Sequence, residues 1–216
     1  MKKEGVLGAL RATGVVAVIR TEHSSDLVSV AEALWEGGVR LIEITLTVPG
    51  ALEVIRESIA RIGKDRAFVG AGTVLDAQAA RDAIDAGAAF VVSPGLDHQT
   101  VALCNEAGVL VMPGAFTPHE ILQAWKAGAD VVKVFPADLG GPDYIKTVKE
   151  PLPQVELLPT KGITLSSAPA FIRAGAMAVG AGSALVNGAM IRSREYARIT
   201  ENASAFVRAV RAAREG

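Results

Sequence analysis

The strongest constraint on the fold is a unit that recurs along the chain. In each unit, a helix-compatible segment rich in Ala, Glu and Leu ends in glycine, and a short apolar run follows. The closing glycines are Gly38, Gly87, Gly108, Gly128 and Gly175. Glycine just past a helix end adopts the left-handed cap conformation at little cost. With further units placed at Gly63 and near Pro153, the period is about 20–25 residues.

The apolar runs predict eight strands with helices between them. They are Val15–Arg20, Arg40–Thr45, Ala67–Ala71, Ala88–Ser93, Val109–Met112, Asp130–Phe135, Val155–Thr160 and Ala176–Ala181. Several are apolar almost throughout, which is typical of parallel strands buried on both faces. We therefore expect an α/β fold of the (β/α)8 TIM-barrel type, with a doubly wound open sheet as the alternative. Extra helices are expected near Lys2–Ala12 and Glu195–Arg214, and residues 1–216 are expected to form one domain.

Composition excludes several classes of protein. Half of the residues are hydrophobic and 21% are charged, which suits a dry core and argues against disorder. The 22 Lys and Arg residues nearly balance 23 acidic ones, so the chain as a whole attracts neither nucleic acid nor an anionic membrane. The single cysteine, Cys104, excludes an internal disulfide and fits a reducing compartment.

One uncharged stretch has the length of a membrane span. It runs for 18 residues from Ala174 to Ile191, but it is rich in Gly and Ala and contains Ser183 and Asn187. A buried strand followed by a short helix is the favoured interpretation. The segment Met1–Arg11 lacks the apolar core of a signal peptide, so a cytoplasmic location is expected.

Lys133 is the most informative candidate for chemistry. It lies in an otherwise apolar predicted strand, on the same face as Val131 and Phe135. An ammonium group among such neighbours is poorly solvated, and a neutral amine is the nucleophile that forms a Schiff base with a ketone. The alternatives are a lysine that extends to solvent and one that pairs with an acid for structural reasons.

Glu43 is the matching acid. It shares one strand face with Leu41 and Thr45, and its strand and that of Lys133 are the second and sixth. Because alternate strands fill the same layer inside such barrels, Glu43 and Lys133 are expected to face each other. A carboxylate near a reactive amine can move protons through a water molecule. A structural ion pair between the two residues is the alternative.

Two loops resemble a phosphate cradle. Thr160-Lys161-Gly162 and Gly180-Ala181-Gly182-Ser183 follow the seventh and eighth predicted strands, where such barrels frequently hold phosphate. Glycine lets backbone amides approach an anion, and a helix starting near Ser183 would add its N-terminal dipole.

The histidines and the cysteine give no indication of a bound cofactor. His23, His98 and His119 have no spacing typical of metal ligands, so no metal is expected. His119 follows Thr117-Pro118 at a predicted helix start and is expected at the surface. Cys104 lies within a predicted helix and is expected to be a small core residue.

Taken in order, the motifs resemble a known family. They are Glu43-Ile44-Thr45, Gly70-Ala71-Gly72-Thr73, Ser93-Pro94, Pro113-Gly114 with Thr117-Pro118, Lys133-Val134-Phe135-Pro136 and Gly182-Ser183. The set resembles the 2-keto-3-deoxy-6-phosphogluconate (KDPG) aldolases, class I enzymes that also act on 4-hydroxy-2-oxoglutarate (KHG). The resemblance runs from about Val15 to Gly188 and so covers most of the chain.

This resemblance implies a carbon–carbon lyase of the Entner–Doudoroff pathway. It implies pyruvate and glyceraldehyde 3-phosphate as products, no cofactor and a homotrimer of barrels. It assigns the Schiff base to Lys133, the acid/base role to Glu43, the neighbourhood of the substrate carboxyl group to Thr73, and the phosphate to Gly162 and Ser183. The expected substrate-binding residues are Arg20, Thr47, Thr73, Pro94, Phe135, Thr160, Lys161, Gly162, Gly182 and Ser183.

Two positions depart from the family pattern. Many members have Arg at the place of Thr47, so Arg20 is expected to carry more of the contact with the substrate carboxylate. The phosphate loop usually has glycine where this chain has Lys161. The gluconate or galactonate epimer therefore stays open as substrate. Outside this chemistry, the alternatives are a phosphosugar isomerase or decarboxylase and a non-catalytic phosphosugar-binding barrel.

Overall fold

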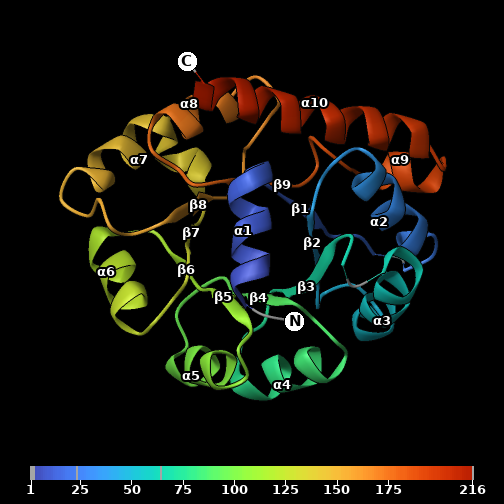
Figure 1. Cartoon of the computed structure of the whole chain (residues 1–216), viewed down its shortest axis with the longest axis horizontal. Helices are drawn as coiled ribbons and strands as arrows, with labels where there is room; N and C mark the ends of the chain where they lie inside the picture. The colour runs from blue at the N-terminus through green and yellow to red at the C-terminus, as the bar shows by residue number, and fades with distance from the viewer. Residues whose placement is uncertain (1–2, 23, 64, 216) are drawn as a thin grey trace.

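The computed structural model describes residues 3–22, 24–63 and 65–215 and shows strands alternating with helices around a central axis (Figure 1). The strands are β1 (Val15–Ile19), β2 (Leu41–Thr45), β3 (Phe68–Gly72), β4 (Phe90–Val92), β5 (Leu110–Met112), β6 (Gly114–Ala115), β7 (Val132–Val134), β8 (Leu157–Pro159) and β9 (Val179–Ala181). The helices are α1 (Lys3–Thr13), α2 (Leu27–Glu36), α3 (Ala51–Ile62), α4 (Ala77–Asp85), α5 (His98–Glu106), α6 (Pro118–Lys126), α7 (Gly141–Lys149), α8 (Ala168–Arg173), α9 (Gly188–Arg192) and α10 (Tyr196–Glu215), with a 3-10 turn, η1, at Ala137–Leu139.

The strands close into a parallel barrel. Within the described residues, one sheet has the order β5-β4-β3-β2-β1-β9 and the other the order β6-β7-β8. On one side, β5 and β6 are successive pieces of one strand, interrupted at Pro113, which has no N–H to donate. On the other side, Thr160 bridges to Gly180, and the Met177 amide donates to the Leu157 carbonyl at 3.0 Å. The barrel prediction is confirmed, and the open sheet is excluded.

Each predicted strand overlaps an observed one. The observed strands are shorter than predicted, except that β3 extends one residue past its predicted end, to Gly72. The run Ala88–Ser93, for example, is paired as a strand over Phe90–Val92. The short strand β6 was not predicted, because it lies in a Pro-Gly sequence that usually marks a turn. The predicted glycine caps are confirmed. The φ angles are +96° at Gly38, +94° at Gly87, +66° at Gly108, +97° at Gly128 and +101° at Gly175.

The helix α1 lies across the N-terminal end of the barrel, at the centre of the view in Figure 1. Its buried residues Val6 and Leu10 join a cluster with inward-facing side chains from the strands. The strand members of that cluster include Val16, Leu41, Phe90, Leu110 and Met112. Apolar side chains therefore fill the amino-terminal end of the barrel. The polar residues at the ends of the strands lie at the opposite, carboxyl-terminal end.

The C-terminal helix α10 packs along the outside of the barrel beside α2 and α8 (Figure 1). Its predicted apolar face is confirmed, because Ile199, Ala203, Phe206 and Val210 are buried and Val207 is partly buried. Gly37, just after α2, permits close approach, since a Cβ there would lie 2.4 Å from the Ala203 Cβ.

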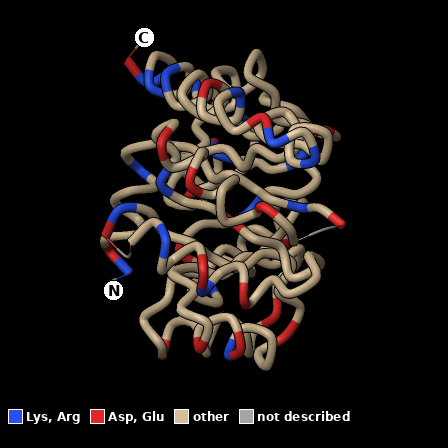
Figure 2. Tube along the Cα trace, turned by 90° about the vertical axis from the view of Figure 1, so that its right-hand side faces the viewer, with Lys and Arg blue, Asp and Glu red and all other residues tan. Residues whose placement is uncertain are grey.

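Charged residues of both signs are scattered along the chain rather than separated by sign (Figure 2). The uncharged stretch 174–191 contains β9 and the short helix α9, as expected. Among the described residues, no helix combines the length and the apolar character that a membrane crossing requires.

Candidate active site

Lys133 occupies the middle of β7, with buried valines on either side. Its exposed fraction is 6%, and its Nζ lies 5.2 Å from the centre of the Phe135 ring. The strand is held on one side by the Lys133 amide, which donates to the Pro113 carbonyl at 2.9 Å. The amine is therefore inside the barrel, and the alternative of a lysine extended to solvent is excluded.

Glu43 lies in β2 and is 1% exposed. Burial raises the pKa of its carboxyl group, and the positive charges of Lys133 and Arg20 act in the opposite direction. Within the described residues, Glu43 forms no ion pair, and its Oε1 has no hydrogen-bond partner. Leaving a buried acceptor unpaired costs about 1–3 kcal/mol. Structural pairing with Lys133 therefore does not explain this carboxylate.

Two glycines of β3 make room beside these groups. A Cβ on Gly72 would lie 1.9 Å from Glu43 Oε1 and 2.5 Å from its carboxyl carbon. A Cβ on Gly70 would lie 2.5 Å from the Phe90 ring. Because residues two apart share a strand face, both glycines face the interior. Gly72 thus provides the space that the Glu43 carboxylate occupies, and Gly70 provides the space for the Phe90 ring.

Beside Glu43, three predicted substrate residues follow the ends of β1, β2 and β3. Arg20 is exposed, and its Nη2 donates to Thr73 Oγ1 at 3.0 Å. Thr73 has a φ of +56°, a left-handed conformation that is uncommon for a residue with a side chain. Thr47 is exposed, and its hydroxyl lies 2.9 Å from the buried hydroxyl of Thr45. Of these three predicted substrate residues, Arg20 is the one that carries a positive charge.

Thr160 and Lys161 form the expected phosphate end together with Gly162. Thr160 is 7% exposed, and Gly180 makes room for it, because a Cβ there would lie 2.3 Å from Thr160 Oγ1. Lys161 and Gly162 are exposed and have φ angles of +84° and +73°. For a residue with a Cβ, the left-handed conformation costs about 1–2 kcal/mol. Lys161 therefore adopts a backbone conformation that glycine would adopt more easily.

The helix expected near Ser183 is not present there, so that prediction is wrong. Ser183 is exposed in a single turn that the Leu185 amide closes by donating to the Gly182 carbonyl at 2.8 Å. The helix α9 begins at Gly188, where Asn187 Oδ1 accepts two amide hydrogen bonds at 3.1 Å as its cap. Asparagine is among the residues most favoured at the N-cap position. With Asn187 as the cap, the helix begins at Gly188, five residues after Ser183.

Asp138 packs on the loop expected to bind phosphate, a contact that the sequence did not predict. A Cβ on Gly162 would lie 2.5 Å from the Asp138 Cβ, so η1 packs directly on this loop. The signal available in the sequence was a carboxylate three residues after the predicted strand Asp130–Phe135. An isolated aspartate in a loop gave no reason to place it against Gly162.

Pro94 and Phe135 line an open cavity of about 390 Å³ beside the strand ends. The other lining residues are Gly95, Leu96, His98, Gly114, Ala115, Phe116, His119, Glu120 and Gln123. Gly114 allows the close approach, because a Cβ there would lie 2.2 Å from the Pro94 carbonyl oxygen. His119 is exposed at the start of α6, as predicted.

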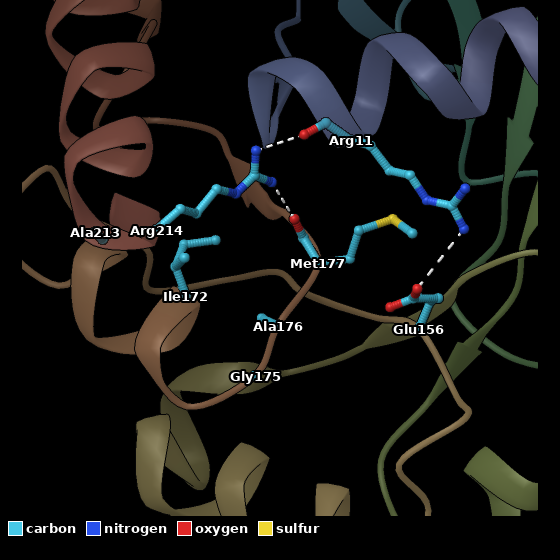
Figure 3. A pocket seen from close by; sticks show the side chains of 8 residues that line it. All are labelled: Arg11, Glu156, Ile172, Gly175, Ala176, Met177, Ala213 and Arg214. Carbon is cyan, nitrogen blue, oxygen red and sulfur yellow. Dashed lines mark hydrogen bonds and ion pairs between the residues drawn. The ribbon is translucent and has the colours of Figure 1, made fainter. Parts of the chain in front are cut away.

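A cavity of about 510 Å³ lies at the opposite end of the barrel, near the starts of β8 and β9 (Figure 3). Arg214 crosses it and donates to the carbonyls of Arg11 and Met177, each at 2.5 Å. Arg11 lies 3.8 Å from the carboxylate of Glu156. The Arg214 guanidinium thus joins the end of α1 to the segment that leads into β9, at the opposite end of the barrel from the polar strand ends.

The remaining candidates stay outside the site. Among the described residues, no three His, Cys, Asp or Glu side chains gather as metal ligands, and His23 lies outside that part of the chain. Cys104 is buried in α5, as predicted, and burial raises the pKa of its thiol to about 11.

A buried amine and an unpaired carboxylate at the carboxyl ends of parallel barrel strands place the chain among the α/β-barrel enzymes. The chain belongs to the KDPG and KHG aldolase family, whose model matches residues 6–202. A KDPG aldolase of Treponema pallidum is 35% identical over 199 residues, which cover 90% of this chain and 92% of the relative.

Solved structures of KDPG aldolases share the fold. The Zymomonas mobilis enzyme, solved with 3-phosphoglycerate, is 32% identical with a TM-score of 0.83, covering 93% of this chain and 94% of its own. The Legionella pneumophila enzyme, solved with pyruvate captured as a covalent carbinolamine, is 29% identical with a TM-score of 0.82, covering 91% and 95%.

Proposed function

We propose that this protein cleaves KDPG to pyruvate and glyceraldehyde 3-phosphate through a Schiff base on Lys133. The observation that carries the proposal is the buried Lys133 amine in the same barrel as the unpaired Glu43 carboxylate. The carbinolamine in the Legionella relative supports covalent chemistry with pyruvate. KHG, cleaved to pyruvate and glyoxylate, is the second proposed substrate, in line with the family description.

In the proposed reaction, the neutral Lys133 amine adds to the C2 ketone, water leaves, and a protonated iminium forms. Glu43 accepts the C4 hydroxyl proton through a water molecule as the C3–C4 bond breaks. The electron pair of that bond moves into the iminium, which gives an enamine and releases the aldehyde. Glu43 then returns its proton to C3, and water hydrolyses the iminium to free pyruvate and Lys133.

The substrate-binding roles follow the two ends of the site. Arg20, Thr47 and Thr73 bind the carboxylate end, and Pro94 and Phe135 border the reacting carbons. The phosphate end consists of Thr160, Lys161, Gly162, Gly182 and Ser183. The 3-phosphoglycerate in the Zymomonas relative supports recognition of a phosphorylated three-carbon acid. A cytoplasmic homotrimer is part of the proposal, and light scattering at three times the chain mass of 22.4 kDa tests its assembly.

A pyruvate-release assay coupled to lactate dehydrogenase tests this function. Purified protein is given KDPG, its galactonate epimer and KHG, and NADH oxidation is followed. We expect turnover of KDPG by the native chain and none by Lys133→Ala, with Cys104→Ala as a matched substitution of another buried residue. Conversion without pyruvate would support an isomerase or decarboxylase, and binding without turnover would support a phosphosugar-binding barrel.

A further inference from the structure

The side chain of Arg20 spans the end of β2, above Glu43. Arg20 directly follows β1, Thr73 directly follows β3, and β2 lies between these two strands in the sheet. The hydrogen bond of 3.0 Å from Arg20 to Thr73 therefore crosses over the carboxyl-terminal end of β2. Glu43 lies two residues before that end, at Thr45, and on the same strand face.

The Glu43 carboxylate is positioned against the same structure. Its Oε1 occupies the space that Gly72 leaves free, and Gly72 is bonded in the chain to Thr73. Thr73 keeps its left-handed φ of +56° while it accepts the Arg20 hydrogen bond. Arg20 and the Glu43 carboxylate thus lie at the same part of the site, where β1, β2 and β3 end.

The charged groups that act on Glu43 are Lys133 from β7 and Arg20 after β1, and both lower the pKa of a carboxyl group that burial raises. Their situations differ. Lys133 is 6% exposed and reacts with the substrate ketone, whereas Arg20 is exposed and open to an anion from solution. A carboxylate that binds a guanidinium takes up its hydrogen bonds and offsets its charge.

We propose that Arg20 couples binding of the substrate carboxylate to the basicity of Glu43. This inference rests on the proposed aldolase function. Before substrate binds, the Arg20 charge helps to keep Glu43 ionised although it is buried. Once the substrate carboxylate binds Arg20, that charge is offset, and Glu43 holds a proton more strongly. Glu43 therefore becomes a stronger base in the complex in which it must accept the C4 hydroxyl proton.

Paired pH profiles test this coupling. The acidic limb of kcat/KM reports the free enzyme, and that of kcat reports the complex. We compare the native chain with Arg20→Gln, which removes the charge, and Arg20→Lys, which keeps it. We expect Arg20→Gln to move the kcat/KM limb to higher pH and the kcat limb by less, because substrate already offsets Arg20 there. Arg20→Lys should leave both limbs near their native positions.

Comparing the variants cancels the contribution of Lys133, because all three proteins keep this residue and form the same iminium on it. Equal movement of both limbs in Arg20→Gln would overturn the coupling, and so would a kcat/KM limb that does not move. A loss of kcat/KM by the same factor at every pH would leave Arg20 with carboxylate binding alone. In each of these results pyruvate is still released, so the proposed function would stand while the coupling fails.

Discussion

Replacing Gly72 with alanine should displace the Glu43 carboxylate without straining the backbone. Gly72 does not have a positive φ, so alanine fits its conformation, and the effect comes from the added methyl group. That group would lie 1.9 Å from Glu43 Oε1, whereas ordinary contact begins at 3.4 Å. The oxygen must therefore move by about 1.5 Å, the difference between these two distances.

A displacement of this size should be costly for catalysis and moderate for stability. Misplacing a catalytic group by about 1 Å can cost on the order of 10²-fold in rate. Overpacking a buried site typically costs about 1–3 kcal/mol. We therefore expect Gly72→Ala to lower kcat for pyruvate release about a hundredfold, and to reduce the free energy of unfolding by an amount in that range.

Steady-state kinetics and urea unfolding measure these effects. Gly95→Ala is the matched control on the same end of the barrel, because a Cβ there meets no atom within 4 Å. The double variant Gly72→Ala, Glu43→Ala should regain most of the lost stability, since the clash is gone, but stay inactive. If Gly72→Ala keeps kcat within about threefold of the native value while folded, Glu43 is not the base in this position.

Three further perturbations probe other parts of the account. Lys161→Gly should lower kcat/KM for KDPG about tenfold, roughly 1.4 kcal/mol, and leave KHG cleavage unchanged; equal losses on both substrates would place Lys161 at the reacting end. EDTA should leave the rate of pyruvate release unchanged, because the iminium supplies the electron sink, and a rate that falls and returns with one divalent ion would contradict the mechanism. Arg214→Gln should cost about 2 kcal/mol, since hydrogen bonds from a charged group to the Arg11 and Met177 carbonyls are lost. A melting temperature lower by about 4–8 °C with unchanged kcat would support that role, whereas an unchanged melting temperature would contradict it.

The barrel could be predicted because its signals are local and repeat. A glycine cap such as Gly87 followed by an apolar run marks each unit, and helix periodicity places faces such as that of α10. The second and sixth strand positions then predict that Glu43 and Lys133 face the same interior. Parallel barrels leave few other places for a polar residue in an apolar strand.

Other features depend on contacts that no local pattern records. The unpaired Oε1 of Glu43 and its fit against Gly72 require the pairing of β2 with β3 at the observed register. The Arg20 contact with Thr73 joins residues 53 apart in the sequence. The start of α9 was misplaced because glycine-rich sequence near Ser183 suits a helix start, whereas Asn187 provides the actual cap.

Borohydride trapping with pyruvate, followed by peptide mapping, tests the central claim most directly. Reduction of the iminium would fix the pyruvate carbons irreversibly on the lysine that forms it. We predict one modified peptide, carrying the adduct on Lys133, and no adduct in Lys133→Ala, while Lys161→Ala is labelled like the native chain. An adduct on Lys161, or a Lys133→Ala variant that is still labelled, would contradict the assignment. Turnover of KDPG by folded Lys133→Ala would contradict the mechanism itself.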